Sequence, residues 1–171
     1  MQLGLRIRDW SKYHRSTTVP QESKPISEPL FIRKVDARDA ETAAQLCEEL
    51  GYPVSIEAIK KRIANLERLP DHVVYVGTVS EMVVGWIDVG IVHHLQSEPY
   101  GEIGGFVVSN AYRSQGVGQR LLAQAEQWVA NRRITQMVVR SRITREPAHR
   151  FYLREGYSHT KTSAVFSKKL K

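Results

Sequence analysis

The chain has 171 residues, of which 42% are hydrophobic, and carries a formal net charge of +7 at pH 7. This composition predicts one domain with its own core, and no apolar run is long enough to cross a bilayer. The single cysteine excludes an intrachain disulfide and favours a reducing, cytoplasmic location. The charge suits an anionic ligand, but the basic residues are scattered, which favours a soluble basic surface over nucleic-acid binding.

The first 30 residues differ from the rest of the chain. Pro20, Pro25 and Pro29 lie among serine and threonine residues that follow no helical or strand period. We therefore expect an irregular N-terminal extension over residues 1–30 and a domain over residues 31–171.

The domain is predicted to open with a strand and two helices. The strand covers residues 31–35, and Asp36 can cap the helix that follows, which Gly51 ends. Ser55 can cap the second helix. Cys47 falls on the apolar face of the first helix, where a small buried hydrophobe is a better interpretation than a catalytic nucleophile.

The middle of the chain is rich in β-branched residues. Two apolar segments, 72–79 and 83–89, flank a polar turn and predict a β-hairpin. A loop over residues 90–101 then leads to a central strand over residues 102–108.

The last third is predicted to contain an amphipathic helix from Val117 to Val129, a strand over 136–140, a short helix over 147–155 and a final hairpin over 157–170. The crossover from the central strand to residues 136–140 requires a parallel pair. The fold class is therefore mixed α/β (α+β), a mostly antiparallel sheet with one central parallel βαβ pair.

The turn between the central strand and the amphipathic helix is the most informative segment. It places Arg113, Gly116 and Gly118 in an R-x-x-G-x-G pattern directly before the helix. The first N–H groups of a helix lack intrahelical partners and lie at the positive end of the macrodipole, so this turn can bind phosphate. The chain lacks the string of a P-loop and the third glycine of a dinucleotide fingerprint.

Two blocks around this turn resemble the GCN5-related N-acetyltransferase (GNAT) family. The first runs from Glu102 to Leu122 and contains the glycine turn. The second, Ala148-His-Arg-Phe-Tyr-Leu-Arg-Glu-Gly-Tyr157, is similar to the A-x-x-F-Y-x-x-x-G-[FY] ending of the family. The resemblance extends over residues 31–171 and implies the family's twisted sheet, in which the parallel pair splays apart at the acetyl-CoA site.

The resemblance also implies that acetyl-CoA is the co-substrate. The turn would bind its pyrophosphate through backbone N–H groups, and the central strand would pair with its pantetheine arm. Ser141 is a candidate because Arg145 stands where the family often has an asparagine that contacts pantetheine. The residues assigned to acetyl-CoA in this way are Phe106, Val107, Val108, Arg113, Ser114, Gln115, Gly116, Val117, Gly118 and Ser141.

Two residues are candidates for proton transfer. Tyr152 lies where the family has the tyrosine that protonates the leaving thiolate, although its ring could instead be structural. Glu102 heads the central strand and could take a proton from the amine through water, but a solvated carboxylate at a strand end explains it equally well. The backbone N–H of Val108 or a neighbour would stabilise the oxyanion.

These assignments predict direct transfer of an acetyl group from acetyl-CoA to a primary amine of a small molecule. A non-catalytic acetyl-CoA-binding regulatory module and a protein or peptide N-acetyltransferase remain alternatives. The histidines have no metal-ligand spacing, so we expect no metal. A homodimer is compatible with the sequence, a membrane partner is not expected, and the identity of the amine is left open.

Overall fold

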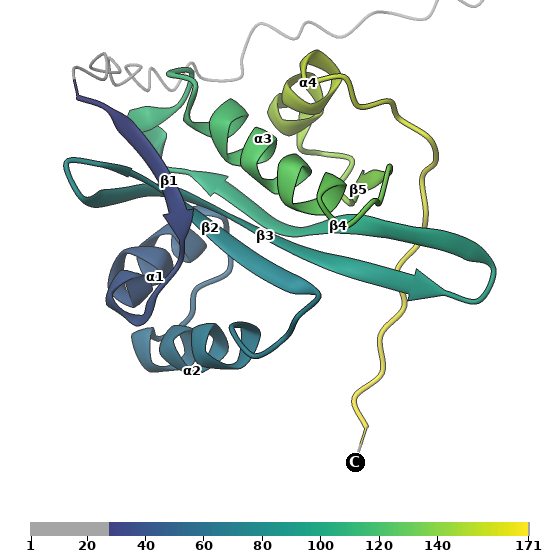
Figure 1. Ribbon diagram of the computed structural model, residues 1–171, viewed down its shortest axis with the longest axis horizontal. Helices are drawn as coiled ribbons and strands as arrows, with labels where there is room; N and C mark the ends of the chain where they lie inside the picture. The colour runs from purple at the N-terminus through teal and green to yellow at the C-terminus, as the bar shows by residue number, and fades with distance from the viewer. Residues whose placement is uncertain (1–27, 171) are drawn as a thin grey trace, which may run out of the picture.

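The computed structural model describes residues 28–170, so the extension expected over residues 1–30 lies almost entirely outside the described residues. One sheet runs through the domain in the order β1-β2-β3-β4-β5 (Figure 1). Neighbouring strands are antiparallel except β4 and β5, which are parallel, and this confirms the predicted mixed α/β sheet. The strands are β1 (Leu30–Lys34), β2 (His72–Val79), β3 (Met82–His94), β4 (Ser97–Val108) and β5 (Met137–Val139).

Helices cover both faces of the sheet. The first two lie on one face, and the last two lie on the other (Figure 1). Each side has its own hydrophobic core, and the β4 side chains divide between the two cores. The helices are α1 (Ala40–Glu49), α2 (Ile56–Leu66), α3 (Val117–Ala130) and α4 (Glu146–Arg154).

Two of the predicted caps are present. The side chain of Ser55 accepts from the N–H of Ala58 at 3.2 Å and begins α2. Asp36 accepts from the N–H of Arg38 at 2.8 Å, but it caps a single 3-10 turn that leads into α1 rather than α1 itself.

β3 and β4 form a long hairpin that was not predicted, and the expected loop over residues 90–101 is wrong. Those residues end β3 and begin β4, and the turn between them is at Leu95 and Gln96. Pro99 is tolerated inside β4 because it lies where the β3–β4 register is irregular, between the pairs made by Val92 and His94, so it does not have to donate a ladder hydrogen bond.

β4 contains a β-bulge at Gly104. Two consecutive β3 residues lie opposite Gly105 and Ile103, so Gly104 has no partner on that strand. Ile103 and Phe106 both pack on the α3 side, although they are three residues apart. The bulge therefore adds backbone length to β4 without changing which face the flanking side chains take.

The final hairpin predicted over residues 157–170 is wrong. Residues 157–170 have no regular secondary structure, and the chain runs away from the domain as an extended segment (Figure 1). Val165, Phe166 and Leu170 are 87%, 92% and 86% exposed. A strand needs a partner, and no strand of the described domain pairs with this segment.

No helix within residues 28–170 combines the length and the apolar character that crossing a membrane requires.

Candidate active site

The site is organised by a gap between β4 and β5. Pairing between these strands ends at Ile103, whereas β4 continues to Val108. Backbone groups of a strand point alternately to its two sides, and the N–H of Ser109 donates to the carbonyl of Val84 on β3 at 2.9 Å. The backbone groups of Phe106 and Val108 therefore point away from β3 and into the gap.

The glycine turn lies at the end of this gap and begins α3. Gly116 is the N-cap residue, in the left-handed conformation with φ of 82°. No side chain caps the helix, and its first turn holds no acidic residue. Ser114 also has a positive φ, of 60°. The bare helix N-terminus fits a bound phosphate, because its N–H groups have no partner of their own.

The other residues of the turn present different groups to a ligand. Arg113 is exposed, and its Nε donates to the carbonyl of Val108 at 3.2 Å, which fixes the guanidinium beside the gap. Gln115 donates to the carbonyl of Ala111 at 2.9 Å and so braces the turn. Val117 is buried, so only its N–H is available to a ligand.

Gly118 provides room for aromatic rings. A Cβ at this position would lie 3.3 Å from the ring of Phe151 and 3.6 Å from the ring of Phe106. The sequence suggested that this glycine makes space for a ligand. The structure adds that α4 packs against α3 through it.

Val107 and Ser141, both assigned to acetyl-CoA, show no group directed into the gap by a described contact. The carbonyl of Val107 points toward Gly85 of β3, and the Val107 side chain is buried on the α1 side. Ser141 is exposed after β5, and its side chain makes no hydrogen bond to the rest of residues 28–170. Their role in binding stays a prediction.

Tyr152 lies on α4 in a cluster of aromatic rings. Its ring centroid is 6.5 Å from that of Phe106, 5.4 Å from that of Phe151 and 5.6 Å from that of Tyr157. Burial raises the pKa of Tyr152 to about 12, against a smaller lowering by the charge of Arg145. The phenol is therefore protonated at neutral pH and beside the strand that borders the gap.

Glu102 lies on the opposite face of β4 and is ion-paired. Its carboxylate accepts from the Nε of Arg140 at 2.7 Å. The same guanidinium is 3.4 Å from the hydroxyl of Tyr100, which is 3.2 Å from the Nε2 of His94. The sequence did not predict this network, because the register that places Glu102 opposite Val138 of β5 is not visible in the chain.

Arg145 and Arg142 bridge the open end of the gap to the loop between α1 and α2. Arg145 donates to the carbonyl of Leu50 at 2.9 Å. Arg142 donates to the hydroxyl of Tyr52 at 3.0 Å. Arg145, at the family's asparagine position, is therefore directed to the α1–α2 loop.

A histidine and an aspartate that the sequence analysis did not consider contact each other on β2 and β3. The Nε2 of His72 is 2.6 Å from the Oδ1 of Asp88. Both atoms are buried, and neither has a hydrogen-bond partner of good geometry within the described residues, so the pair is a close polar contact rather than a well-aligned hydrogen bond. The sequence carries no local signal for this pair, because only the β2–β3 register, with His72 opposite Gly90, brings the two residues together.

Cys47 is half-buried at the edge of the α1 core, and burial raises the pKa of its thiol. A raised pKa reduces the thiolate fraction, which agrees with the structural interpretation of this residue. Across residues 28–170, no group of three histidine, cysteine or acidic side chains is placed to hold a metal ion.

Comparison with known proteins agrees with this geometry. Residues 38–157 match the model of the acetyltransferase (GNAT) family. The chain is 30% identical over 142 residues to an aminoalkylphosphonate N-acetyltransferase of Salmonella typhimurium, covering 82% of this chain and 90% of that protein.

Two solved structures share the fold. One is the aminoglycoside N-acetyltransferase AAC(6')-Iy in complex with CoA, with a TM-score of 0.75, 17% identity and coverage of 86% and 99% of the two chains. The other is a transcriptional regulator from Bacillus halodurans, with a TM-score of 0.70, 21% identity and coverage of 81% and 100%.

The chain belongs to the GNAT family of acetyltransferases. It is an enzyme of the acyltransferase class.

Proposed function

We propose that the protein transfers an acetyl group from acetyl-CoA directly to the primary amine of a small molecule. The observation that carries this proposal is the junction of strand and helix. The backbone groups of Phe106 and the N–H of Val108 point into the gap beside an α3 N-terminus with no capping side chain. An amide-bearing arm can pair with such a strand edge, and its diphosphate can accept from the helix N–H groups.

The protein's own groups have distinct roles in this reaction. Tyr152 gives a proton to the leaving sulfur, and the N–H of Val108 or Phe106 stabilises negative charge on the carbonyl oxygen. Arg113, Ser114 and Gln115 hold the turn that receives the pyrophosphate. Glu102 is the candidate proton acceptor from the sequence, but its carboxylate already accepts from Arg140.

The acceptor that the site favours carries an anionic group, such as a phosphonate, besides its amine. Arg142 and Arg145 lie at the open end of the gap, and neither contacts a carboxylate within the described residues. A guanidinium binds the oxygens of a phosphonate or carboxylate with two parallel hydrogen bonds. The similar Salmonella protein, named for aminoalkylphosphonates, supports the same class.

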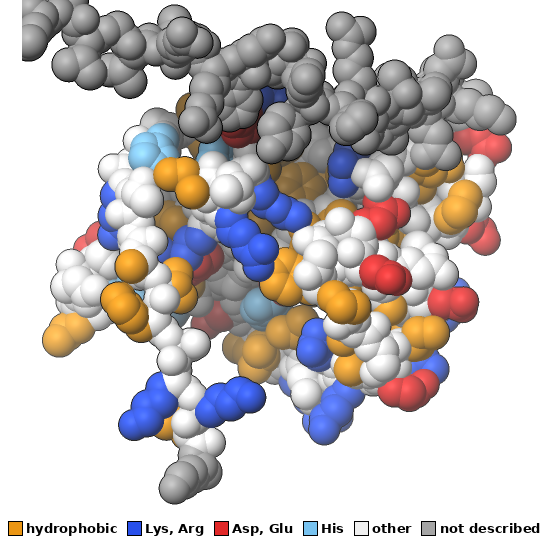
Figure 2. Space-filling view, turned by 180° about the vertical axis from the view of Figure 1, so that it is seen from behind, with side chains coloured by type: hydrophobic (Ala, Val, Ile, Leu, Met, Phe, Trp, Pro, Cys, Tyr) orange, Lys and Arg blue, Asp and Glu red, His pale blue; other side chains and the backbone are white. Residues whose placement is uncertain are grey.

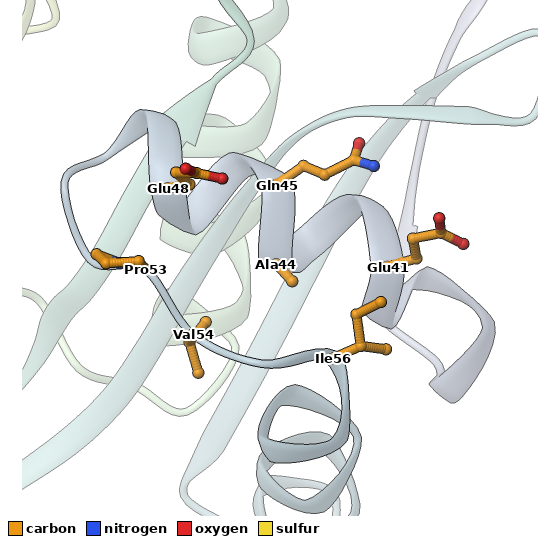
Figure 3. Close-up of a pocket in the computed structure, with 7 residues that line it drawn as sticks. All are labelled: Glu41, Ala44, Gln45, Glu48, Pro53, Val54 and Ile56. Atoms are coloured by element: carbon orange, nitrogen blue, oxygen red, sulfur yellow. The ribbon is translucent and has the colours of Figure 1, made fainter.

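A polycationic acceptor such as an aminoglycoside is the second candidate. A pocket of about 210 Å³ lies between α1 and the segment that leads into α2 (Figure 3). Glu41, Gln45 and Glu48 project from α1 along this pocket. Two carboxylates so placed would attract ammonium groups.

Measuring CoA release with a panel of amines separates these candidates. An aminoalkylphosphonate is expected to have a kcat/KM at least about tenfold above that of the matching uncharged alkylamine, since one charge-assisted contact contributes about 1.4 kcal/mol or more. Arg142→Gln is expected to abolish this preference, whereas Arg150→Gln, which changes an exposed arginine of α4, should preserve it.

Other outcomes of the same panel select the alternatives. Preference for an aminoglycoside selects the second acceptor class, and activity on peptides alone selects a protein N-acetyltransferase. Binding of acetyl-CoA without turnover of any amine selects the regulatory module.

A homodimer is proposed through the open edge of β5. Within the described residues β5 has a strand neighbour on one side only, and the apolar residues of the 158–170 segment are exposed. That segment from a second copy can pair with β5 and cover Val165 and Phe166. The expected result is a dimer by sedimentation for the full chain and a monomer for a chain that ends at Tyr157. A full chain that sediments as a monomer would refute the proposal.

A further inference from the structure

We propose that Asp88, held in place by His72, binds the ammonium group of the acceptor and takes the first of its protons. This inference rests on the proposed function, because it concerns the amine that attacks the acetyl group. It names a group that sequence reasoning passed over and gives Glu102 a different role.

Asp88 lies beside the point where the gap opens. It is opposite Gly105 of β4, and the bulged residue Gly104 is next to it. A Cβ at Gly104 would lie 3.4 Å from Oδ1 and 3.7 Å from Oδ2 of Asp88. Gly104 is the first β4 residue beyond the last β4–β5 pair, so the Asp88 carboxylate lies beside the start of the gap.

Asp88 faces the side of the sheet opposite Tyr152. Trp86 is two residues before Asp88 on β3 and packs against the α1–α2 core, so both side chains face that side. Phe106 and Tyr152 pack on the α3 side. An amine at Asp88 would therefore approach the acetyl carbon from the face opposite the sulfur's proton donor, and the two proton transfers would not compete for space.

Two glycines of β4 make room for β3 side chains on this face. Gly105 lies under the Trp86 ring, where a Cβ would come within 2.6 Å of it. Gly104 is exposed. Figure 2, which views the molecule from behind Figure 1, shows a hollow near the middle of that view, with a histidine side chain in it and Lys and Arg side chains around it.

His72 fixes the carboxylate. Its Nε2 lies 2.6 Å from Oδ1, and it reaches Asp88 across Gly90, whose lack of a side chain leaves room for the ring. The Asp88 side chain is 27% exposed although its Oδ1 is buried, so Oδ2 can receive an ammonium group. An imidazole that holds one oxygen of an aspartate orients the other for proton transfer.

Glu102 is less suited to the same task. The Arg140 guanidinium at 2.7 Å is permanently charged and compensates the negative charge of Glu102. The partner of Asp88 is an imidazole, which, unlike a guanidinium, carries no permanent charge to compensate the carboxylate. Glu102 with Arg140 then forms the polar edge of the acceptor site.

The proton transfers balance as follows. The ammonium group loses one proton to the Asp88–His72 pair, which passes it to solvent. The neutral amine forms the C–N bond, the C–S bond breaks, and the sulfur takes a proton from Tyr152. The nitrogen loses its second proton to solvent, which returns one to Tyr152, so one acetamide, one thiol and one free proton result.

The test compares two variants, Asp88→Asn and Asp71→Asn. Asp71 is the exposed residue that precedes His72 in the chain, and within residues 28–170 its carboxylate pairs with His93 at 3.8 Å. Asp88→Asn is expected to lower kcat/KM for the acceptor about 100-fold at unchanged CoA affinity, the low end for one acid–base group. Asp71→Asn is expected to keep wild-type turnover. Equal turnover of the two variants would overturn the proposal.

Two further variants keep the test decisive if Asp88→Asn does not fold. Gly104→Val places a side chain beside the carboxylate, and it should raise the acceptor KM while leaving the CoA dissociation constant unchanged. His72→Gln keeps an N–H donor near the position of Nε2 and should retain most of the activity that His72→Leu loses. Unchanged acceptor KM in Gly104→Val, or equal activity of the two His72 variants, would contradict the proposal.

If the proposed acetyltransferase function is wrong, the experiment gives a different result from the ones above. In that case the wild-type protein binds acetyl-CoA and releases no CoA with any amine, so no variant effect on turnover exists to be measured.

Discussion

Replacing Tyr152 with phenylalanine is expected to lower kcat about 100-fold, as for one acid–base group, while leaving CoA affinity nearly unchanged. The substitution keeps the ring, which contacts Phe106, Phe151 and Tyr157, and removes only the hydroxyl. Steady-state kinetics with a saturating acceptor and calorimetric titration with CoA measure the two quantities separately.

The pKa of Tyr152 also predicts how kcat changes with pH. A general acid works while it is protonated, so its contribution is lost as pH rises through its pKa. Because burial raises the pKa of Tyr152 to about 12, the contribution should persist across the neutral and mildly basic range. Wild-type kcat should therefore show no decline attributable to Tyr152 below about pH 11, one unit under that pKa.

Tyr157→Phe is the matched control. Tyr157 belongs to the same ring cluster, but its hydroxyl donates to Glu126 at 3.0 Å rather than facing the gap. This variant should lose stability by about 1 kcal/mol, the net contribution of a hydrogen bond, and keep its turnover. If Tyr152→Phe also keeps its turnover, Tyr152 is a structural residue and water protonates the thiolate.

Replacing Gly116 with valine is expected to weaken acetyl-CoA binding about 30-fold, which corresponds to about 2 kcal/mol. Gly116 has a φ of 82°, which a β-branched residue strongly disfavours, so the N–H groups of the turn would be displaced. In the proposed complex, several charge-assisted hydrogen bonds to the pyrophosphate would depend on these groups. Calorimetric titration of the folded variant with CoA measures the loss.

Gly156→Val separates strain from binding. Gly156 has a φ of 90°, and neither glycine has an atom within 4 Å of its ideal Cβ position. The two variants should therefore lose similar amounts of stability, while only the Gly116 variant loses CoA affinity. Equal CoA affinity in both would exclude the turn as the pyrophosphate site.

Local signals in the sequence were sufficient to predict the order of elements up to α4. Short segments of the sequence contain the signals for the glycine turn, for the caps at Asp36 and Ser55 and for the alternating strands. The parallel pair followed from the handedness and length of one crossover. The two GNAT blocks then led to the family, which the comparisons confirm.

Features that depend on register or on partners could not be predicted. The pairs His72–Asp88 and Glu102–Arg140 each join residues on different strands, and only the strand register brings them together. The 157–170 segment has a strand-like composition, but whether it forms a strand depends on a partner, which the sequence does not specify.

The extra residue at the Gly104 bulge affects the width of the opening between β4 and β5. A β4 strand without Gly104 would keep Ile103 and Phe106 toward α3, but it would lose the local bend that accompanies the extra residue. The opening between β4 and β5 would then be narrower, although every neighbouring side chain would be unchanged. The proposed capacity of the site to hold a thioester between two strands therefore depends on the number of residues in β4. Substituting side chains one at a time leaves that number unchanged.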